Sequence, residues 1–242
     1  DYLASRLVAN GWNVKPLHRE ILLSQTYLQS AAYREDAAKE DKDARLLWRF
    51  PPRRLSAEEL RDTMLTVGGK LQLEPMGGPG FRLYRYLANN VSTYVPLDTH
   101  GPESYRRAVY HQNARASVVD VLNDFDLPDI AFAAPKRANT TTPLQALTLL
   151  NDETMMEASR ALAKSMLAAK TEDRLPLLYQ AVLTRPASTK ELAVLQRELD
   201  RALAHYRAHP EDARKLQTTP ELAAHTLVAS LVLNLDEAIT HE

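Results

Sequence analysis

The order of apolar and polar positions predicts a chain built mainly from helices, and its sharpest signal lies between residues 137 and 151. Thr142 can cap a helix, Pro143 suits the first helical position, and Gln145 stands where a capping box needs an amide or a carboxylate. A helix is therefore predicted to begin at Thr142. It divides a mixed, loop-rich half of the chain from a purely helical half.

Leucines of this predicted helix recur at regular steps, at Leu144, Leu147 and Leu150, and Met155 continues the series. Residues spaced by three or four positions lie on one face of a helix. We expect this face to pack against a core.

Further helices are predicted on both sides by the same periodicity and by capping residues. They span residues 2–10, 13–30, 56–67, 113–123, 152–169, 174–183, 188–208 and 220–235, and residues 34–43 read as a solvated loop or a frayed helix end. The side chains expected to face inward in the first three are Leu3, Leu7, Val8, Leu17, Ile21, Tyr27, Leu28, Leu60, Met64 and Val67.

Residues 71–110 differ in character, because aromatic and β-branched residues are common there and Gly-Gly-Pro-Gly at 77–80 favours a turn. Residues 82–86 and 105–110 alternate imperfectly between apolar and polar, as strands with one wet face do. The predicted fold is a mainly α, multi-helix single domain with a small antiparallel β element around residues 80–112. Residues 1–136 form its mixed half and residues 137–242 its all-helical half, and the chain reads as a fragment of a longer one.

Composition excludes several classes of function but does not identify the function itself. The 242 residues carry a net charge of -1, whereas nucleic-acid binders usually have a marked basic excess, so nucleic acid is not an expected partner. Cysteine is absent, which excludes disulfides, thiolate metal sites and covalent haem attachment within this chain. No apolar run approaches the roughly 20 residues that span a bilayer.

Four closely spaced carboxylates are a candidate metal site: Asp120, Asp124, Asp126 and Asp129. Hard cations such as calcium bind carboxylates on irregular backbone, but the glycine and distal glutamate of an EF-hand loop are missing. Ion pairing and loop capping is the stronger interpretation.

A group of arginines beside two aromatic residues is a candidate anion site. Its members are Arg49, Arg53, Arg54 and Arg61, near Trp48 and Phe50. Guanidinium groups suit phosphate, sulfate or carboxylate. The alternative is that the arginine stems lie over aromatic faces and pair with Glu58, Glu59 or Asp62.

Polar residues around the start of the central helix are a third candidate, with Arg137, Asn139 and Gln145 among them. Backbone N–H groups at a helix N-terminus could hold an anion or a sugar hydroxyl, although plain capping explains these residue types.

Histidines give weaker signals. His205 and His209 are one helical turn apart and could bind one metal, but no glutamate lies between them and a helix C-terminus explains their position. His18, His100 and His111 are isolated in the sequence.

Several stretches together resemble one family, and they are specific in combination. They are residues 46–49, 53–55, 58–62, 76–79, 125–129, 137–151, 185–186 and 234–237. Between Leu3 and Glu237 the chain is similar to the PSD-one domain of planctomycete and related bacterial proteins. That domain has no known function and usually follows a cytochrome-c-like module and a second uncharacterised domain. Pro186-Ala187 departs from the Pro-Thr of the family at a predicted helix cap.

The resemblance implies an exported, extracytoplasmic parent protein, periplasmic or on the cell surface. Haem c is expected only in upstream domains, with no cofactor in this chain, and no catalytic residues are implied. The leading expectation is a non-catalytic module that binds other domains of its parent, a redox partner protein or carbohydrate.

The alternative is a hydrolase or redox-linked enzyme that acts on complex polysaccharide, with Asp126, Asp129 and Arg137 at its site. Such an enzyme should gather two or more carboxylates with a histidine or arginine around one cleft. A binding module should instead expose aromatic residues such as Trp48, Tyr84 or Tyr94. A structural spacer would show no concave polar pocket.

Overall fold

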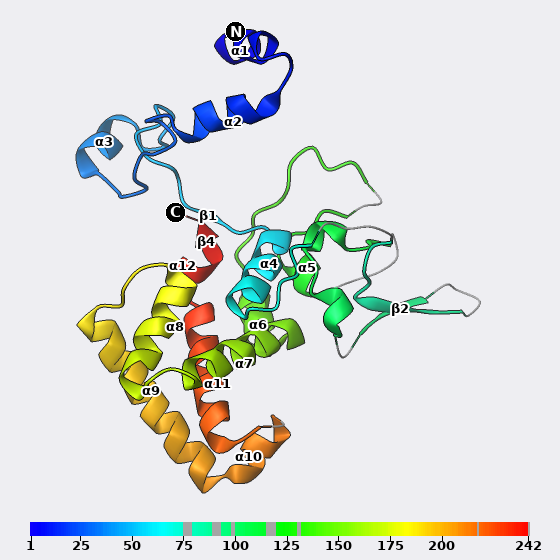
Figure 1. Cartoon of the computed structure of the whole chain (residues 1–242), viewed down its shortest axis with the longest axis vertical. Helices are drawn as coiled ribbons and strands as arrows, with labels where there is room; N and C mark the ends of the chain where they lie inside the picture. The colour runs from blue at the N-terminus through cyan, green and yellow to red at the C-terminus, as the bar shows by residue number, and fades with distance from the viewer. Residues whose placement is uncertain are drawn as a thin grey trace. The chain divides into compact units, whose positions relative to one another are not determined.

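The computed structural model describes residues 1–74, 79–88, 93–97, 100–114, 120–129, 132–216 and 218–241. Within them the chain is mainly helical, with twelve α-helices and two small two-stranded sheets. It forms two compact units (Figure 1). One comprises residues 1–53 with the last two residues, and the other comprises residues 54–240.

The first unit holds three short helices: α1 (Tyr2–Ala9), α2 (Val14–Leu22) and α3 (Glu35–Glu40). Asn13 caps α2 by accepting a hydrogen bond from the Lys15 N–H at 3.1 Å, as its position in the sequence predicts. An ion pair of 3.2 Å between Arg6 and Glu20 joins α1 to α2. Helix α2 ends at Leu22, well before the predicted end near residue 30.

These helices have almost no buried side chains. Within residues 1–53 only Ala44 is buried. The expectation that the apolar stripes of the first two helices face inward is wrong for most of their members, which are exposed: Leu3, Val8, Ile21, Tyr27 and Leu28. The periodicity gives the start of both helices but not the end of α2, and their apolar stripes stay exposed.

The second unit begins with α4 (Ala57–Val67), and a capping box between Ser56 and Glu59 fixes its start as predicted. Leu60 and Met64 point into the core, also as predicted. The next helix is α5 (Asp120–Asp124), which overlaps the end of the helix predicted over 113–123; residues 113 and 114 are not helical, and residues 115–119 lie outside the described part. Two helices then meet end to end, α6 (Pro143–Asn151) and α7 (Glu153–Leu167), with Asp152 as the N-cap of α7.

The remaining helices form the C-terminal part of this unit. They are α8 (Arg174–Leu183), α9 (Thr189–Ala208), α10 (Pro210–Lys215), α11 (Pro220–Leu233) and α12 (Asp236–Ile239). Helix α11 is buried on nearly all sides and packs against α7 and α9 (Figure 1). Its sequence is apolar all round, which is typical of a helix at the centre of a core.

The β element is smaller than expected and is paired differently. Strand β2 (Tyr84–Leu87) pairs antiparallel with β3 (Thr93–Pro96), so that Tyr84 faces Pro96 and Leu87 faces Thr93. The predicted partner strand at residues 105–110 was wrong. That segment contains the 3₁₀ helix η2 (Ala108–Tyr110), preceded by η1 (Pro102–Ser104).

In and beside this segment the described residues form two isolated bridges in place of a strand ladder, Gln72 to Arg106 and Phe81 to His111. The predicted turn at residues 77–80 falls largely outside the described part of the chain. Two short strands, β1 (Arg53–Arg54) and β4 (Thr240–His241), pair with each other.

Helix α6 corrects another prediction. Its start is as predicted, because Thr142 and Gln145 form the capping box with Pro143 in the first turn. Its burial is the reverse of the expected pattern, since Leu144, Leu147 and Leu150 are exposed while Gln145 and Leu149 are buried. The cap depends on local contacts and the buried face on tertiary neighbours, so only the cap follows from the local sequence.

Candidate functional site

The residues predicted as candidate sites fall into three separate groups. The first centres on Asp126, which adopts a left-handed backbone conformation with φ of 64° just after α5. Its carboxylate pairs with the Arg54 guanidinium at 2.5 Å and accepts hydrogen bonds from the N–H and hydroxyl of Thr140 at 2.8 and 2.9 Å. The Arg54 guanidinium also lies over the Phe125 ring, 5.0 Å from its centroid.

Gln145 and Asp124 extend this network into α6. The Gln145 side-chain amide donates to the Asp124 carbonyl at 2.8 Å and to the Thr140 carbonyl at 3.2 Å. The Asp124 carboxylate accepts a hydrogen bond from the Thr148 hydroxyl. Four predicted residues, Arg54, Asp124, Asp126 and Gln145, therefore meet in one network. Their polar groups bind one another and nearby backbone, which fixes the loop before α6 against α5.

Arg137 forms the second group with a partner on α4. Its guanidinium holds both oxygens of the Glu58 carboxylate, at 2.6 and 2.8 Å, although half of its side chain is exposed. The hydrogen bonds from Arg137 lower the pKa of the Glu58 carboxyl below its usual value. Asn139 and Asp129 are exposed, and Arg53 is exposed in the first unit.

The third group consists of the buried side chain of Arg61 and the backbone carbonyls that it contacts. One guanidinium nitrogen donates to the Arg106 carbonyl at 3.0 Å, another donates to the Ser104 carbonyl, and the group lies 4.9 Å from the centroid of the Phe81 ring. Burial lowers the pKa of Arg61 to about 10, so the side chain stays charged at neutral pH. Arg54 and Arg61 thus serve different partners rather than one anion pocket.

In the first unit, Arg49 lies over the rings of Trp48 and Tyr33, at 5.0 and 5.2 Å. Three of the four arginines grouped by sequence, Arg49, Arg54 and Arg61, therefore stack on aromatic rings, as the alternative interpretation holds.

The metal hypothesis gains no support in the described residues, where no group of three histidine, aspartate or glutamate side chains could hold an ion. Asp124 and Asp126 have protein partners instead. His205 and His209 are close, with ring centroids 5.0 Å apart, but each faces its own carboxylate, Asp212 or Glu211.

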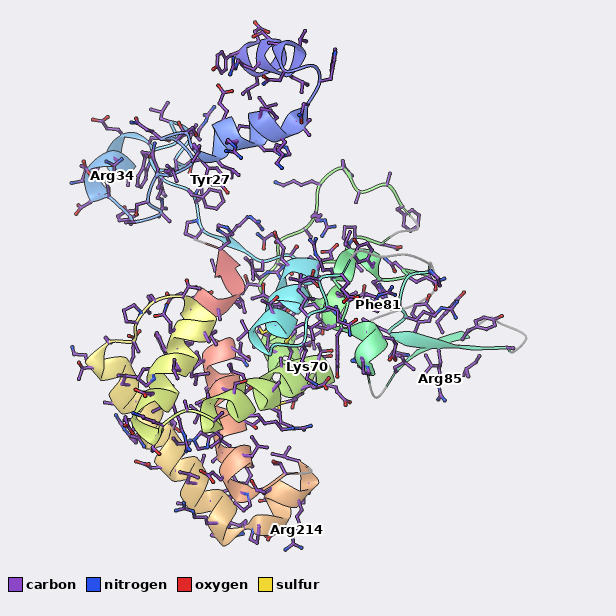
Figure 2. All side chains as sticks on the ribbon, in the orientation of Figure 1. Tyr27, Arg34, Lys70, Phe81, Arg85 and Arg214 are labelled. Carbon is purple, nitrogen blue, oxygen red and sulfur yellow. The ribbon has the colours of Figure 1, made fainter. Side chains whose placement is uncertain are left out.

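A group of titratable side chains that the sequence did not suggest lies at the start of α7. The Lys70 ammonium donates to the Glu157 carboxylate at 2.6 Å and to the Tyr105 hydroxyl at 3.2 Å, and Tyr105 donates to the same carboxylate oxygen. Burial alone would raise the pKa of Glu157, but these hydrogen bonds outweigh it and lower that pKa. Glu157 is therefore a carboxylate at neutral pH. Figure 2 shows Lys70 beside α7.

Thr154 and His100 complete this group. His100 Nδ1 lies 3.2 Å from the hydroxyl oxygen of Thr154, and the backbone N–H of Thr154 donates to Asp152 Oδ1 at 2.9 Å. His100 interacts electrostatically with both Asp152 and Glu157. We call Lys70, His100, Tyr105, Asp152, Thr154 and Glu157 the α7 cluster.

Sequence reasoning missed this cluster because its members come from distant segments. Glu157 lies 87 positions from Lys70 and 52 from Tyr105, and Thr154 lies 54 from His100. The one local signal is that Asp152, Thr154 and Glu157 fall within two turns of one helix.

An enzyme would gather two or more carboxylates in one cleft, and a binding module would expose aromatic residues on its surface. One hollow is lined by Arg6, Lys15, Arg19 and Glu20, and two others near α8 each contain one carboxylate, Glu172 or Asp173. None of these three hollows gathers two carboxylates. The three aromatic residues expected on an exposed surface are not exposed: Tyr84 is buried, and Trp48 and Tyr94 are half-buried.

No helix in the described residues is long and apolar enough to cross a membrane. No curated protein and no solved structure matches the chain. The family comparison does find a match, because residues 1–199 fit PSD1, described as a protein of unknown function (DUF1553). This match covers most of the chain, and it agrees with the resemblance seen in the sequence motifs. The chain therefore belongs to the PSD1 (DUF1553) family.

Proposed function

We propose that the chain is a non-catalytic, extracytoplasmic interaction module of a multidomain, cytochrome-linked protein. Residues 1–53 supply its docking surface, and the partner is another domain of the same protein. The observation that carries this proposal is the missing core of that segment. Only Ala44 is buried, whereas fourteen large apolar side chains between Tyr2 and Phe50 are exposed.

The size of this apolar surface fits a protein interface. Five of the exposed side chains are aromatic: Tyr2, Trp12, Tyr27, Tyr33 and Phe50. At 150–250 Å² for a whole aromatic side chain, these five expose on the order of 600 Å². A standard interface buries about 800 Å² on each partner.

The contacts within the second unit support a structural role for most of the predicted site residues. The Arg54–Asp126 pair and the Gln145 amide bind neighbouring protein groups. A hydrolase or redox-linked enzyme acting on polysaccharide is the alternative, but no described contact favours it. Arg137 is held by Glu58 and Asp126 by Arg54, so two of the residues assigned to that site are engaged elsewhere.

Oxidative footprinting with hydroxyl radicals tests the proposal, because labelling follows side-chain exposure. We expect strong labelling of Trp12 and Tyr27 in the isolated chain and protection of both in the full-length parent protein. Exposed Tyr86 of the second unit serves as an internal reference. Equal labelling of Trp12 and Tyr27 in the two proteins would contradict docking onto another domain.

A matched pair of variants locates the surface. Leu23→Ser removes an exposed apolar side chain from the first unit, and Val109→Ser removes one of similar exposure from the second. In the parent protein, Leu23→Ser should restore labelling of Trp12, whereas Val109→Ser should leave Trp12 protected.

A further inference from the structure

We propose that a basic hollow between α1 and α2 binds an acidic segment of the partner domain, in which aspartate or glutamate side chains lie next to apolar ones. The inference rests on the docking function proposed above and specifies the chemistry of the partner. Three observations carry it: a hollow on one face of α2, two cations without carboxylate partners, and exposed apolar residues beside them.

The hollow lies within the first unit and has a volume of about 500 Å³. This volume falls in the range of about 300–1,000 Å³ that is usual for binding pockets. Arg6 of α1 lines one side. Residues of α2 line the other side, where Lys15 and Arg19 are one helical turn apart and Leu23 follows after another turn. The hollow is therefore built by one face of α2 against α1.

The charges that line the hollow do not cancel. Hydrogen bonds from Tyr2 and Arg6 lower the pKa of the Glu20 carboxyl, so Glu20 is ionised at neutral pH. Its ion pair with Arg6, at 3.2 Å, offsets one positive charge. Lys15 and Arg19 are exposed and have no ion-pair partner among the described residues. With three cations and one carboxylate in its lining, the hollow carries a net charge of +2.

Charged groups outside the lining leave this sign unchanged. Asp1 and His18 belong to the same helical region but do not line the hollow. If the Asp1 carboxylate is counted as well, the sum stays positive, and protonation of His18 would only add to it. Residues 24–53 contribute no side chain to the lining. A carboxylate of a partner is therefore attracted to the hollow.

An acidic segment with apolar neighbours suits this surface better than other partners. Ammonium and guanidinium groups bind carboxylates through charge-assisted hydrogen bonds. A basic or purely apolar segment would instead bury Lys15 and Arg19 without partners, which is unfavourable. Leu23 lines the hollow, Trp12 precedes Asn13 in its lining, and both apolar side chains are exposed. A free anion would leave these two side chains in water, whereas a protein segment covers them.

Hydroxyl-radical footprinting of Trp12 tests the charge of the partner with two double variants of the parent protein. Lys15→Glu/Arg19→Glu reverses both charges, and Lys15→Gln/Arg19→Gln only removes them. Labelling of Trp12 in each parent variant is divided by its labelling in the isolated chain with the same substitutions, so direct effects on Trp12 cancel. This ratio should rise about twofold or more for the glutamate variant and by less for the glutamine variant, because reversal adds repulsion. An unchanged ratio in the glutamate variant overturns the inference.

Lys42→Glu/Arg45→Glu is the matched control. It makes the same change of charge at two exposed residues of the first unit that do not line the hollow. Circular dichroism of each isolated variant verifies that the helices are retained. The control should leave Trp12 protected. An equal loss of protection in the control would assign the effect to the charge of the whole unit and would overturn the assignment to the hollow.

Salt gives a second test that needs no substitution. Raising sodium chloride from about 0.1 to 1 M shortens the screening length from about 10 to 3 Å. Labelling of Trp12 in the unaltered parent protein should then rise towards that of the isolated chain, because screened charges attract the partner less. Protection that does not change with salt would rule out an acidic partner.

The outcomes separate this inference from the docking function. Equal labelling of Trp12 in the isolated chain and in the unaltered parent protein means that the docking function fails. Protection of Trp12 that survives both Lys15→Glu/Arg19→Glu and high salt means that the docking function stands and the acidic segment does not.

Discussion

The two units use similar local sequence signals and reach opposite outcomes. The described residues between 54 and 240 place 27 apolar side chains in one buried cluster, whereas residues 1–53 bury only Ala44. Both regions contain helices with regular apolar stripes and side-chain caps, such as Asn13 before α2 and Ser56 before α4. An apolar stripe therefore specifies which face of a helix has to be covered. Whether another element of the same chain covers that face depends on the rest of the fold.

The largest expected effect comes from making the same substitution, phenylalanine to alanine, once in each unit. Phe125 is 1% exposed in the second unit and Phe50 is 44% exposed in the first. Because a buried ring leaves a cavity, Phe125→Ala should lower the free energy of unfolding by about 3–5 kcal/mol, and Phe50→Ala by less than about 1 kcal/mol. Urea titration followed by far-ultraviolet circular dichroism measures both. Equal losses would mean that the first unit has a core of its own.

The next effect concerns charge, and it contrasts two ion pairs of the second unit, Arg54–Asp126 and Arg137–Glu58. The Arg54–Asp126 side chains are 10% and 12% exposed, whereas Arg137 is 50% exposed. Asp126→Ala should cost about 2–4 kcal/mol, because it leaves the Arg54 charge buried and unpaired, and Arg137→Ala should cost about 0–1 kcal/mol.

Asp126→Asn serves as the control for backbone conformation, since asparagine tolerates the left-handed φ of 64° at this position. Urea midpoints of the three variants give the comparison. If Asp126→Asn is as stable as the parent chain, the ion pair contributes nothing and the backbone conformation alone matters.

A pH effect of intermediate size is expected from a buried histidine. Burial, and then the nearby Arg61 charge, lower the pKa of His111 to about 4, and its ring lies against Phe81 and Tyr84. In the unfolded chain a histidine titrates near 6.5. Between about pH 6.5 and 4 the unfolded state therefore binds more protons. The stabilisation is fully present above pH 6.5 and is lost as pH falls towards 4, by about 1–3 kcal/mol after allowance for partial exposure.

His111→Gln isolates this contribution, because carboxyl groups such as Asp62 and Asp152, whose pKa values burial raises, also titrate in acid. The loss of stability between pH 7 and pH 4.5 should be smaller in His111→Gln than in the parent chain. His18→Gln, at an exposed histidine of the first unit, should keep the full loss. The same pH profile in all three proteins would show that His111 titrates normally.

Helix starts could be predicted from the sequence because their causes are local. The capping boxes at Ser56, Thr142 and Ser188 involve residues three positions apart, and all three mark observed helix starts. The predicted bounds of α8, residues 174–183, are also confirmed. The strand partner of β2 was missed although it is local, with Thr93 only six positions after Leu87, because the four residues of β3 are too few to show a clear alternation.

The candidate site was only partly predictable for the same reason. Residue type suggested that Arg54, Asp126 and Gln145 make polar contacts, and in the structure they belong to one hydrogen-bond network. What each one binds depends on contacts across the fold, such as the 72 positions between Arg54 and Asp126. The α7 cluster lacked even a suggestive pattern, because Lys70 and the pair His100 and Tyr105 reach α7 from segments far from it in the sequence.

The smallest expected effect is that of changing Leu147 on α6, the helix whose predicted and observed buried faces differ. Leu147 is 57% exposed and Leu149 is 4% exposed, two positions apart on one helix. Leu147→Ala should change the free energy of unfolding by less than about 0.5 kcal/mol, and Leu149→Ala should lower it by about 2–5 kcal/mol. Thermal unfolding of the two variants measures the difference. A large loss from Leu147→Ala would mean that the outer stripe of α6 is covered in solution, and α6 would then resemble the first unit in needing a partner.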